Sequence, residues 1–262
     1  MTKREKRNAK YWKSRAIEQE AGIDKLSTET SEKMAKLYRR SFRRLTKDID
    51  ALYAEIQDHS LEELTRTQLY QLNHYIALRD AVAKEVEGLA VEQTRSLDKL
   101  LEFITTGTYK SNVEELGIGF DLLSEYSAKA IATENWSGIK YSDRIWKNAN
   151  GFNTRVMEDV ESLIVGGKMP ADVKKQLMED YTVSWNEADR LIRTESSRAY
   201  NKSAKDSYIA AGVQEAEYLA ENGCCDICRE YKGRRLPMME FPELPMHPNC
   251  RCTIAPIVEG FK

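Results

Sequence analysis

Apolar side chains recur at helical spacing along the first hundred residues. Leu37, Leu45, Leu52 and Ile56 mark one apolar stripe, and a second runs from Leu61 to Ile104. Positions three and four apart share one face of a helix, so these stripes predict two long helices, over about 28–58 and about 60–104. Between them, Ser60 and Glu63 have the spacing of a capping box, which starts the second helix after His59. The two helices are expected to pair as an antiparallel hairpin.

The helical period is lost at residues 105–112, which we interpret as a connection. A short helix is expected over 122–132. A longer one is predicted from Ser142, a plausible N-cap, to the Gly166-Gly167 pair, with Trp146 on its apolar stripe.

Helix signals return after the glycine pair. Pro170 occupies a position where helices prefer to begin, and a short helix is expected from there to about Glu179. Ser184 and Glu187 form a second capping box, which predicts a separate helix that ends near Gly212. Beyond it, residues 213–219 and 253–258 have the pattern of short strands.

Composition supports a helical protein and excludes several classes. The chain of 262 residues has 13 Gly, 6 Pro and 31% charged residues, and five of the prolines and all five cysteines follow residue 223. No run of 18 apolar residues exists, so no membrane span is expected. The basic N-terminus lacks the apolar region of a secretory signal. Cysteines confined to one corner disfavour a disulfide-rich secreted scaffold. We therefore expect a soluble, mostly helical intracellular protein.

Charge is distributed unevenly along the chain. Residues 1–50 hold 15 Lys and Arg against 8 Asp and Glu, although the formal net charge of the whole chain is −2. Six basic residues share one broad helix face: Lys36, Arg39, Arg40, Arg43, Arg44 and Lys47. This face has two interpretations, a solvated helix surface or a contact surface for nucleic acid or an acidic protein. Any nucleic-acid binding there should lack sequence preference and weaken steeply with salt.

Cysteine and histidine residues near the C-terminus have the spacing of a metal site. Cys225 and Cys228 are separated by two residues, as are His247 and Cys250, and 18 residues lie between the pairs. Thiolate and imidazole are preferred ligands of zinc, and four of them close a structural tetrahedral site. Reduced cysteines without metal and a disulfide arrangement are the competing interpretations. The sequence leaves open whether Cys224 or Cys252 replaces a neighbour as ligand.

The predicted fold is mainly α. A basic arm and a long helical hairpin make up residues 1–105, and a helical domain over 106–262 ends in a small zinc-stabilised β module at 213–262. A module rich in proline and poor in apolar residues needs such a metal to fold.

Three features together resemble the C-terminal domain of the phage Mu F-like minor head proteins, also called head morphogenesis proteins of tailed phages. They are the Arg193-Thr194-Glu195 run followed by Asn201, the Cys225-to-Cys228 knuckle followed by Lys232-Gly233, and the closing run from His247 to Cys252. The resemblance covers about residues 150–262. It implies a non-enzymatic virion component at the portal vertex, assembled in the cytoplasm of a bacterial host and involved in head assembly and in DNA packaging or delivery. The implied partners are the portal protein, capsid or scaffold proteins, and non-specific DNA, with no membrane.

Glu195 is the one candidate for an active-site acid. It lies three and four positions from Ile192 and Ala199, so it should face inward, where an acid can have a perturbed pKa. No second carboxylate or Ser/His pair accompanies it, so a structural polar role is expected for Arg193, Glu195 and Asn201. The alternative functions are a zinc-dependent nuclease with a Cys/His finger and a zinc-finger DNA-binding regulator.

Overall fold

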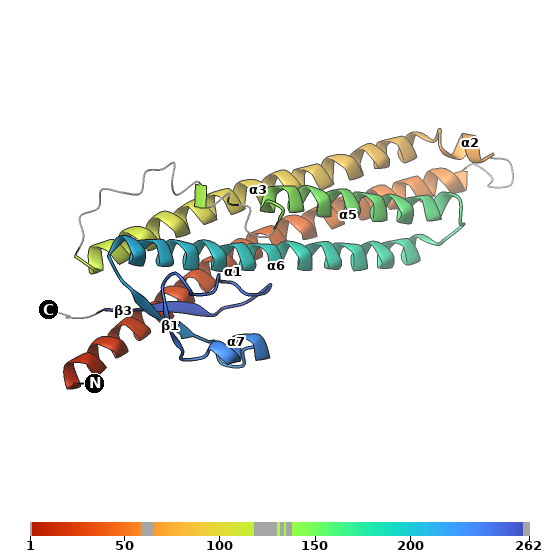
Figure 1. Ribbon diagram of the computed structural model, residues 1–262. Helices are drawn as coiled ribbons and strands as arrows, with labels where there is room; N and C mark the ends of the chain where they lie inside the picture. The colour runs from red at the N-terminus through yellow and green to blue at the C-terminus, as the bar shows by residue number, and fades with distance from the viewer. Residues whose placement is uncertain (1, 59–64, 118–129, 132–133, 135–137, 259–262) are drawn as a thin grey trace. The chain divides into compact units, whose positions relative to one another are not determined.

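Long helices and one small sheet make up the described parts of the chain. The computed structural model describes residues 2–58, 65–117, 130–131, 134 and 138–258. The helices are α1 (Lys3–Asp58), α2 (Arg66–Leu69), α3 (Asn73–Glu115), α5 (Tyr141–Ile164), α6 (Pro170–Ala210) and α7 (Asp226–Tyr231). The strands are β1 (Glu215–Leu219), β2 (Arg235–Pro237) and β3 (Thr253–Ile257), as Figure 1 shows. The mainly α fold with a small C-terminal β module is confirmed.

The chain forms two compact units, each assembled from separate segments. Unit 1 comprises Met1–Thr30, Leu97–Lys140 and Arg190–Lys262, and unit 2 comprises Ser31–Ser96 and Tyr141–Asp189. The helices α1, α3 and α6 each contribute residues to both units. The boundary expected after residue 105 therefore falls inside α3, and neither unit begins or ends there.

Unit 2 is helical, and its core follows the predicted apolar stripes. Leu45, Leu52 and Val82 are fully buried, and edge-to-face contacts join aromatic rings from α1, α5 and α6. Along α1 and α3, Arg44 pairs with Glu85 while Glu55 pairs with His74, which is the order of an antiparallel pair.

Unit 1 combines three helical segments with the sheet. Arg15 of α1 donates to the Ser111 carbonyl of α3 at 2.8 Å. Ser203 of α6 donates to the Thr105 carbonyl at 2.6 Å. The sheet has the order β2-β1-β3 with both pairs antiparallel, and Glu215 of β1 lies opposite both Pro237 and Ile257. The N-terminal part of α1 contacts this sheet through the ion pair of Lys13 with Glu217. The strands expected over 213–219 and 253–258 are confirmed.

The connection expected over 105–112 is wrong, because α3 continues to Glu115. Two of its polar residues are buried against neighbouring segments: Thr105 and Asn112 have no exposed surface, and the Asn112 amide donates to Ser207 Oγ at 3.0 Å. Such contacts override the weak helix propensity of Thr and Gly.

The break expected between Glu179 and Ser184 is also wrong, because α6 is continuous. Ser184 is buried and its hydroxyl lies 3.3 Å from that of Tyr38, so it does not cap a helix. The helix does begin at Pro170, as predicted. It ends in a Schellman motif at Gly212, whose φ is 75° and where the Val213 N–H donates to the Tyr208 carbonyl.

Smaller differences concern the ends of other elements. α5 begins at Tyr141, so Ser142 lies inside it, and Ile145 rather than the 40%-exposed Trp146 faces the core. The Ser60–Glu63 capping box and nearly all of the helix expected at 122–132 lie outside the described residues. A capping box does occur just beyond, where Thr65 and Gln68 exchange hydrogen bonds at the start of α2.

Candidate metal centre and its support on helix α6

The four predicted ligands lie in the β module of unit 1, and three of them, Cys225, Cys228 and His247, have their ligand atoms within 4.8 Å of one another. Cys225 is the N-cap residue of α7, Cys228 lies within that helix, and His247 and Cys250 belong to the loop before β3. The His247 Nε2 atom lies 3.2 Å from Cys225 Sγ and 3.4 Å from Cys228 Sγ. Cys228 Sγ lies 3.7 Å from Cys250 Sγ. The two halves of the motif, which are far apart in sequence, are therefore joined by the contacts of Cys225 and Cys228 with His247 and of Cys228 with Cys250.

The three distances are close to the edges of a tetrahedral metal site, although Cys250 Sγ does not lie within 4.8 Å of all three of the other ligand atoms. With Zn–S bonds of about 2.3 Å and Zn–N bonds of about 2.0 Å, the edges of the tetrahedron are about 3.8 Å for S–S and about 3.6 Å for S–N. A disulfide would instead require an S–S distance of about 2.0 Å. All five cysteines are free thiols, so the disulfide interpretation does not describe this arrangement.

His247 is oriented for metal binding by its other ring nitrogen. Nδ1 lies 2.9 Å from the Pro248 carbonyl oxygen, which can only accept, so Nδ1 carries the proton. The unprotonated Nε2 then faces the two thiols. A backbone carbonyl in this position is a common partner of metal-bound histidine, because it fixes both the tautomer and the ring orientation.

A fourth sulfur lies beside this set. Cys228, Cys250 and Cys252 also have their sulfur atoms within 4.8 Å of one another, and all three side chains are buried. Cys224 belongs to neither potential metal group among the described residues. Cys252 therefore remains an alternative ligand.

The thiols differ in proton affinity because of burial and mutual hydrogen bonds. Burial raises the pKa of Cys228 to about 11. A hydrogen bond with Cys250 lowers the pKa of Cys252 to about 5. A metal ion that binds here must displace protons from the buried thiols, which makes its affinity depend on pH.

Helix α6 holds the ligand loop at two points. Thr194 Oγ1 accepts a hydrogen bond from the backbone N–H of Asn249 at 3.2 Å, and the Asn201 side-chain amide donates to the Cys252 carbonyl at 3.2 Å. Asn249 has a φ of 61°, a left-handed conformation that Asn tolerates better than most residues. The two contacts hold the loop against α6 on both sides of Cys250, at Asn249 and at Cys252.

Arg193 and Glu195, on either side of Thr194, form ion pairs. Arg193 lies 3.6 Å from Asp24 of α1, and Asp24 also pairs with Arg251 at 3.2 Å. Glu195 is 1% exposed, and its carboxylate accepts a hydrogen bond from Arg198 Nε at 2.9 Å. A buried carboxylate paired in this way has a structural environment rather than that of a solvent-accessible acid.

Two residues of this support were not predicted from the sequence. Arg198 lies three positions after Glu195, a spacing that brings side chains together on a helix and that marks it as the partner. Thr194 lies inside the recognised run, but its contact with Asn249 joins residues 55 positions apart. No local sequence signal reports such a contact.

The six basic residues of α1 lie in unit 2 and are all exposed. Arg44 forms an ion pair with Glu85 at 2.7 Å. Neighbouring buried positions such as Leu45 and Ile49 face the core of the same unit. The face is thus a solvent-facing basic stripe on one helix.

Comparison with known proteins connects the metal centre and its helix to one family. Residues 154–255 match the family model described as Phage Mu protein F like protein. The match includes all of α6, the knuckle and the ligand loop, so the resemblance of the C-terminal part of the chain is confirmed. No curated protein and no solved structure showed significant similarity to the chain. No described helix is long and apolar enough to cross a membrane.

Proposed function

We propose that this protein is a minor capsid protein of a tailed phage that acts in head morphogenesis. The family match over residues 154–255 carries the proposal, because it covers the metal centre together with the helix that supports it. In this role the protein is a non-enzymatic component of the virion, assembled in the bacterial cytoplasm. It associates with the portal protein at the portal vertex, near capsid or scaffold proteins, and takes part in DNA packaging or delivery.

The decisive experiment asks whether the protein is part of the particle. Mass spectrometry of purified virions and proheads should detect it in both, and it should co-purify with the portal when particles are disrupted. An abundant host cytoplasmic protein, measured in the same samples, controls for contamination. Absence from virions and from proheads would overturn the proposal.

The module's metal is proposed to be zinc in a structural role. Zinc held by Cys225, Cys228, His247 and Cys250 would have all four positions filled by protein ligands, so it would support folding. Metal analysis of purified protein should find about one equivalent, which Cys250→Ser loses and Cys224→Ser retains. Cys252→Ser tests the alternative ligand. Well under one equivalent in the unaltered protein would contradict the assignment.

The basic stripe of α1 is proposed to contact DNA or an acidic portal surface. The exposure of all six residues supports a role in binding a polyanion. Replacing Arg39, Arg40 and Arg43 with Gln should weaken DNA binding for all sequences alike and flatten its salt dependence by about 0.9 per lost phosphate contact. Unchanged DNA affinity with reduced portal affinity would assign the stripe to the portal, and no change in either would leave it a solvated face.

The nuclease alternative has a direct test as well. It requires divalent-metal-dependent DNA cleavage that Glu195→Ala abolishes. The burial of Glu195 against Arg198 supports the structural role instead. A regulator, in turn, would bind one DNA site far more tightly than others.

A further inference from the structure

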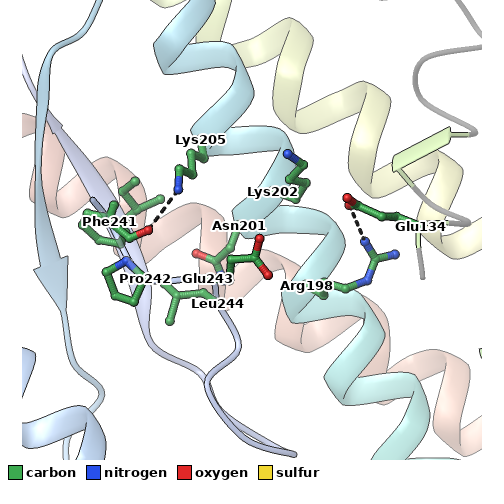
Figure 2. A pocket seen from close by; sticks show the side chains of 10 residues that line it. Glu134, Arg198, Asn201, Lys202, Lys205, Phe241, Pro242, Glu243 and Leu244 are labelled. Atoms are coloured by element: carbon green, nitrogen blue, oxygen red, sulfur yellow. Dashed lines mark hydrogen bonds and ion pairs between the residues drawn. The ribbon is translucent and has the colours of Figure 1, made fainter. Parts of the chain in front are cut away.

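A pocket in unit 1 lies between α6 and the loop that precedes β3 (Figure 2). Its volume of about 50 Å³ leaves room for more than one water-sized group. One wall is a row of side chains spaced three and four apart on α6: Arg198, Asn201, Lys202 and Lys205. The opposite wall is largely apolar and consists of Phe241, Pro242, Leu244 and Ile254. The pocket therefore has one polar and one apolar side.

Asn201 presents an unused acceptor to this pocket. Its Nδ2 donates to the carbonyls of Ser197 at 2.9 Å and Cys252 at 3.2 Å. Because both partners can only accept, the amide nitrogen must face them, and the orientation of the side chain is fixed. Oδ1 is buried, Asn201 is only 3% exposed, and Oδ1 has no hydrogen-bond partner among the described residues. An occupant with an N–H donor would satisfy it.

Two lysines beside Asn201 have donor capacity to spare. Lys205 donates to the Phe241 carbonyl at 3.0 Å, and Lys202 pairs with Asp206 at 3.2 Å. Each ammonium group carries three N–H donors, so one contact leaves further donors for an anionic ligand. Arg198 contributes less, because its guanidinium is engaged by Glu195, by the Ile131 carbonyl and by Glu134.

The acidic residues of the pocket decide which anion fits. Glu134 and Glu243 also line it, so a run of phosphates, which carries several charges, would meet more repulsion than a single carboxylate. A nucleic-acid backbone also has no N–H group for Asn201 Oδ1. A peptide with a glutamate or aspartate side chain supplies a backbone N–H, a single carboxylate for the lysines, and an aliphatic part for Phe241 and Leu244.

We propose that this pocket binds an acidic peptide segment of a partner protein. The segment's backbone N–H donates to Asn201 Oδ1, its carboxylate accepts from Lys202 and Lys205, and an apolar side chain packs on the opposite wall. Asn201 also holds the Cys252 carbonyl, so the segment lies directly against the support of the metal loop. The proposal stands independently of the role in head assembly.

The test uses the full-length protein labelled with ¹⁵N at asparagine. The side-chain signal of Asn201 is identified by its loss in Asn201→Asp. Acetyl-Leu-Glu-Leu-amide should shift this signal saturably with a dissociation constant in the range of about 1 mM. Acetyl-Leu-Gln-Leu-amide should bind at least about fivefold more weakly, since it lacks the carboxylate. A 5′-phosphorylated oligothymidylate is the third probe and should leave the signal in place.

Variants at a lysine assign the charge recognition. Lys202→Gln should weaken binding of the glutamyl peptide about fivefold, and Lys202→Arg, which keeps the charge, should retain it. Lys99→Gln is the matched control, because Lys99 is an exposed lysine of unit 1 that does not line the pocket. No shift of the Asn201 signal, an equal response to both peptides, or a larger response to the oligothymidylate would each overturn the proposal.

Discussion

The hydroxyl of Thr194 connects α6 with the loop that carries two candidate metal ligands. It accepts the Asn249 N–H and itself donates to the Arg190 carbonyl at 2.6 Å. Thr194 is 4% exposed, so water does not easily replace this partner. One buried side chain thus fixes the position of a turn that has an unusual backbone conformation.

Thr194→Val is expected to lower the free energy of unfolding by about 1 kcal/mol, because the Asn249 N–H loses its acceptor while the side-chain shape is kept. Hydrogen exchange of the Asn249 amide should accelerate in the same variant. Thr194→Ser is the matched control, because it keeps the hydroxyl and should keep that amide protected. Equal protection of the Asn249 amide in the Val variant and in the unaltered protein would show that this hydrogen bond does not stabilise the loop.

Helices α5 and α6 of unit 2 bring two carboxyl groups together. Asp159 is buried, and Asp180 is buried beside Arg155, whose Nε donates to it at 2.9 Å. Burial, followed by the hydrogen bond and repulsion from Asp180, raises the pKa of Asp159 to about 7. Because the folded pKa is raised above the unfolded value of 3.8, the contribution of Asp159 to stability is fully present below about pH 4. It is lost as the pH rises through about 7.

Asp159→Asn should therefore raise the melting temperature at pH 8 and reduce the loss of stability between about pH 4 and pH 7. The amide keeps a hydrogen-bonding group beside Asp180 and does not ionise. Glu179→Gln removes an exposed charge from α6, next to Asp180, and should leave the pH profile unchanged. Thermal unfolding across this range measures both variants, and a parallel profile for Asp159→Asn would contradict the assignment.

Local signals predicted the elements where local chemistry decides them. Pro170 and Gly212 mark the ends of α6, because ring geometry and a positive φ act within one or two residues. The signals failed where a distant segment decides. Ser184 has the spacing of a cap, yet it is buried. Its hydroxyl instead contacts the hydroxyl of Tyr38, which lies 146 positions away in the sequence. The x2 spacing, by contrast, pairs Cys225 with Cys228, which the structure groups with His247, whereas only the fold brings Cys252 beside Cys228 and Cys250.

At the scale of the whole molecule, the two units differ in what stabilises them. Unit 2 has a core of fully buried aliphatic and aromatic side chains, such as Leu45, Val156 and Leu177. The module of unit 1 has a core in which Cys228, Cys250 and Cys252 take positions beside Tyr218 and Phe241. Thiols there contribute little apolar area, so a metal ion bound by them would supply a large share of the folding free energy.

Removal of the metal should therefore act on one part of the chain. After treatment with a strong chelator, amide hydrogen exchange is expected to rise across 215–257, where the strands and the ligand loop lose their common anchor. Exchange within the described residues of 31–96 and within 141–189 should stay as in the untreated protein, because their core contains no ligand. The Cys224→Ser protein, given the same chelator, should respond like the unaltered one. A uniform rise in exchange along the chain would mean that both units unfold together, and no rise at 215–257 would mean that the module folds without metal.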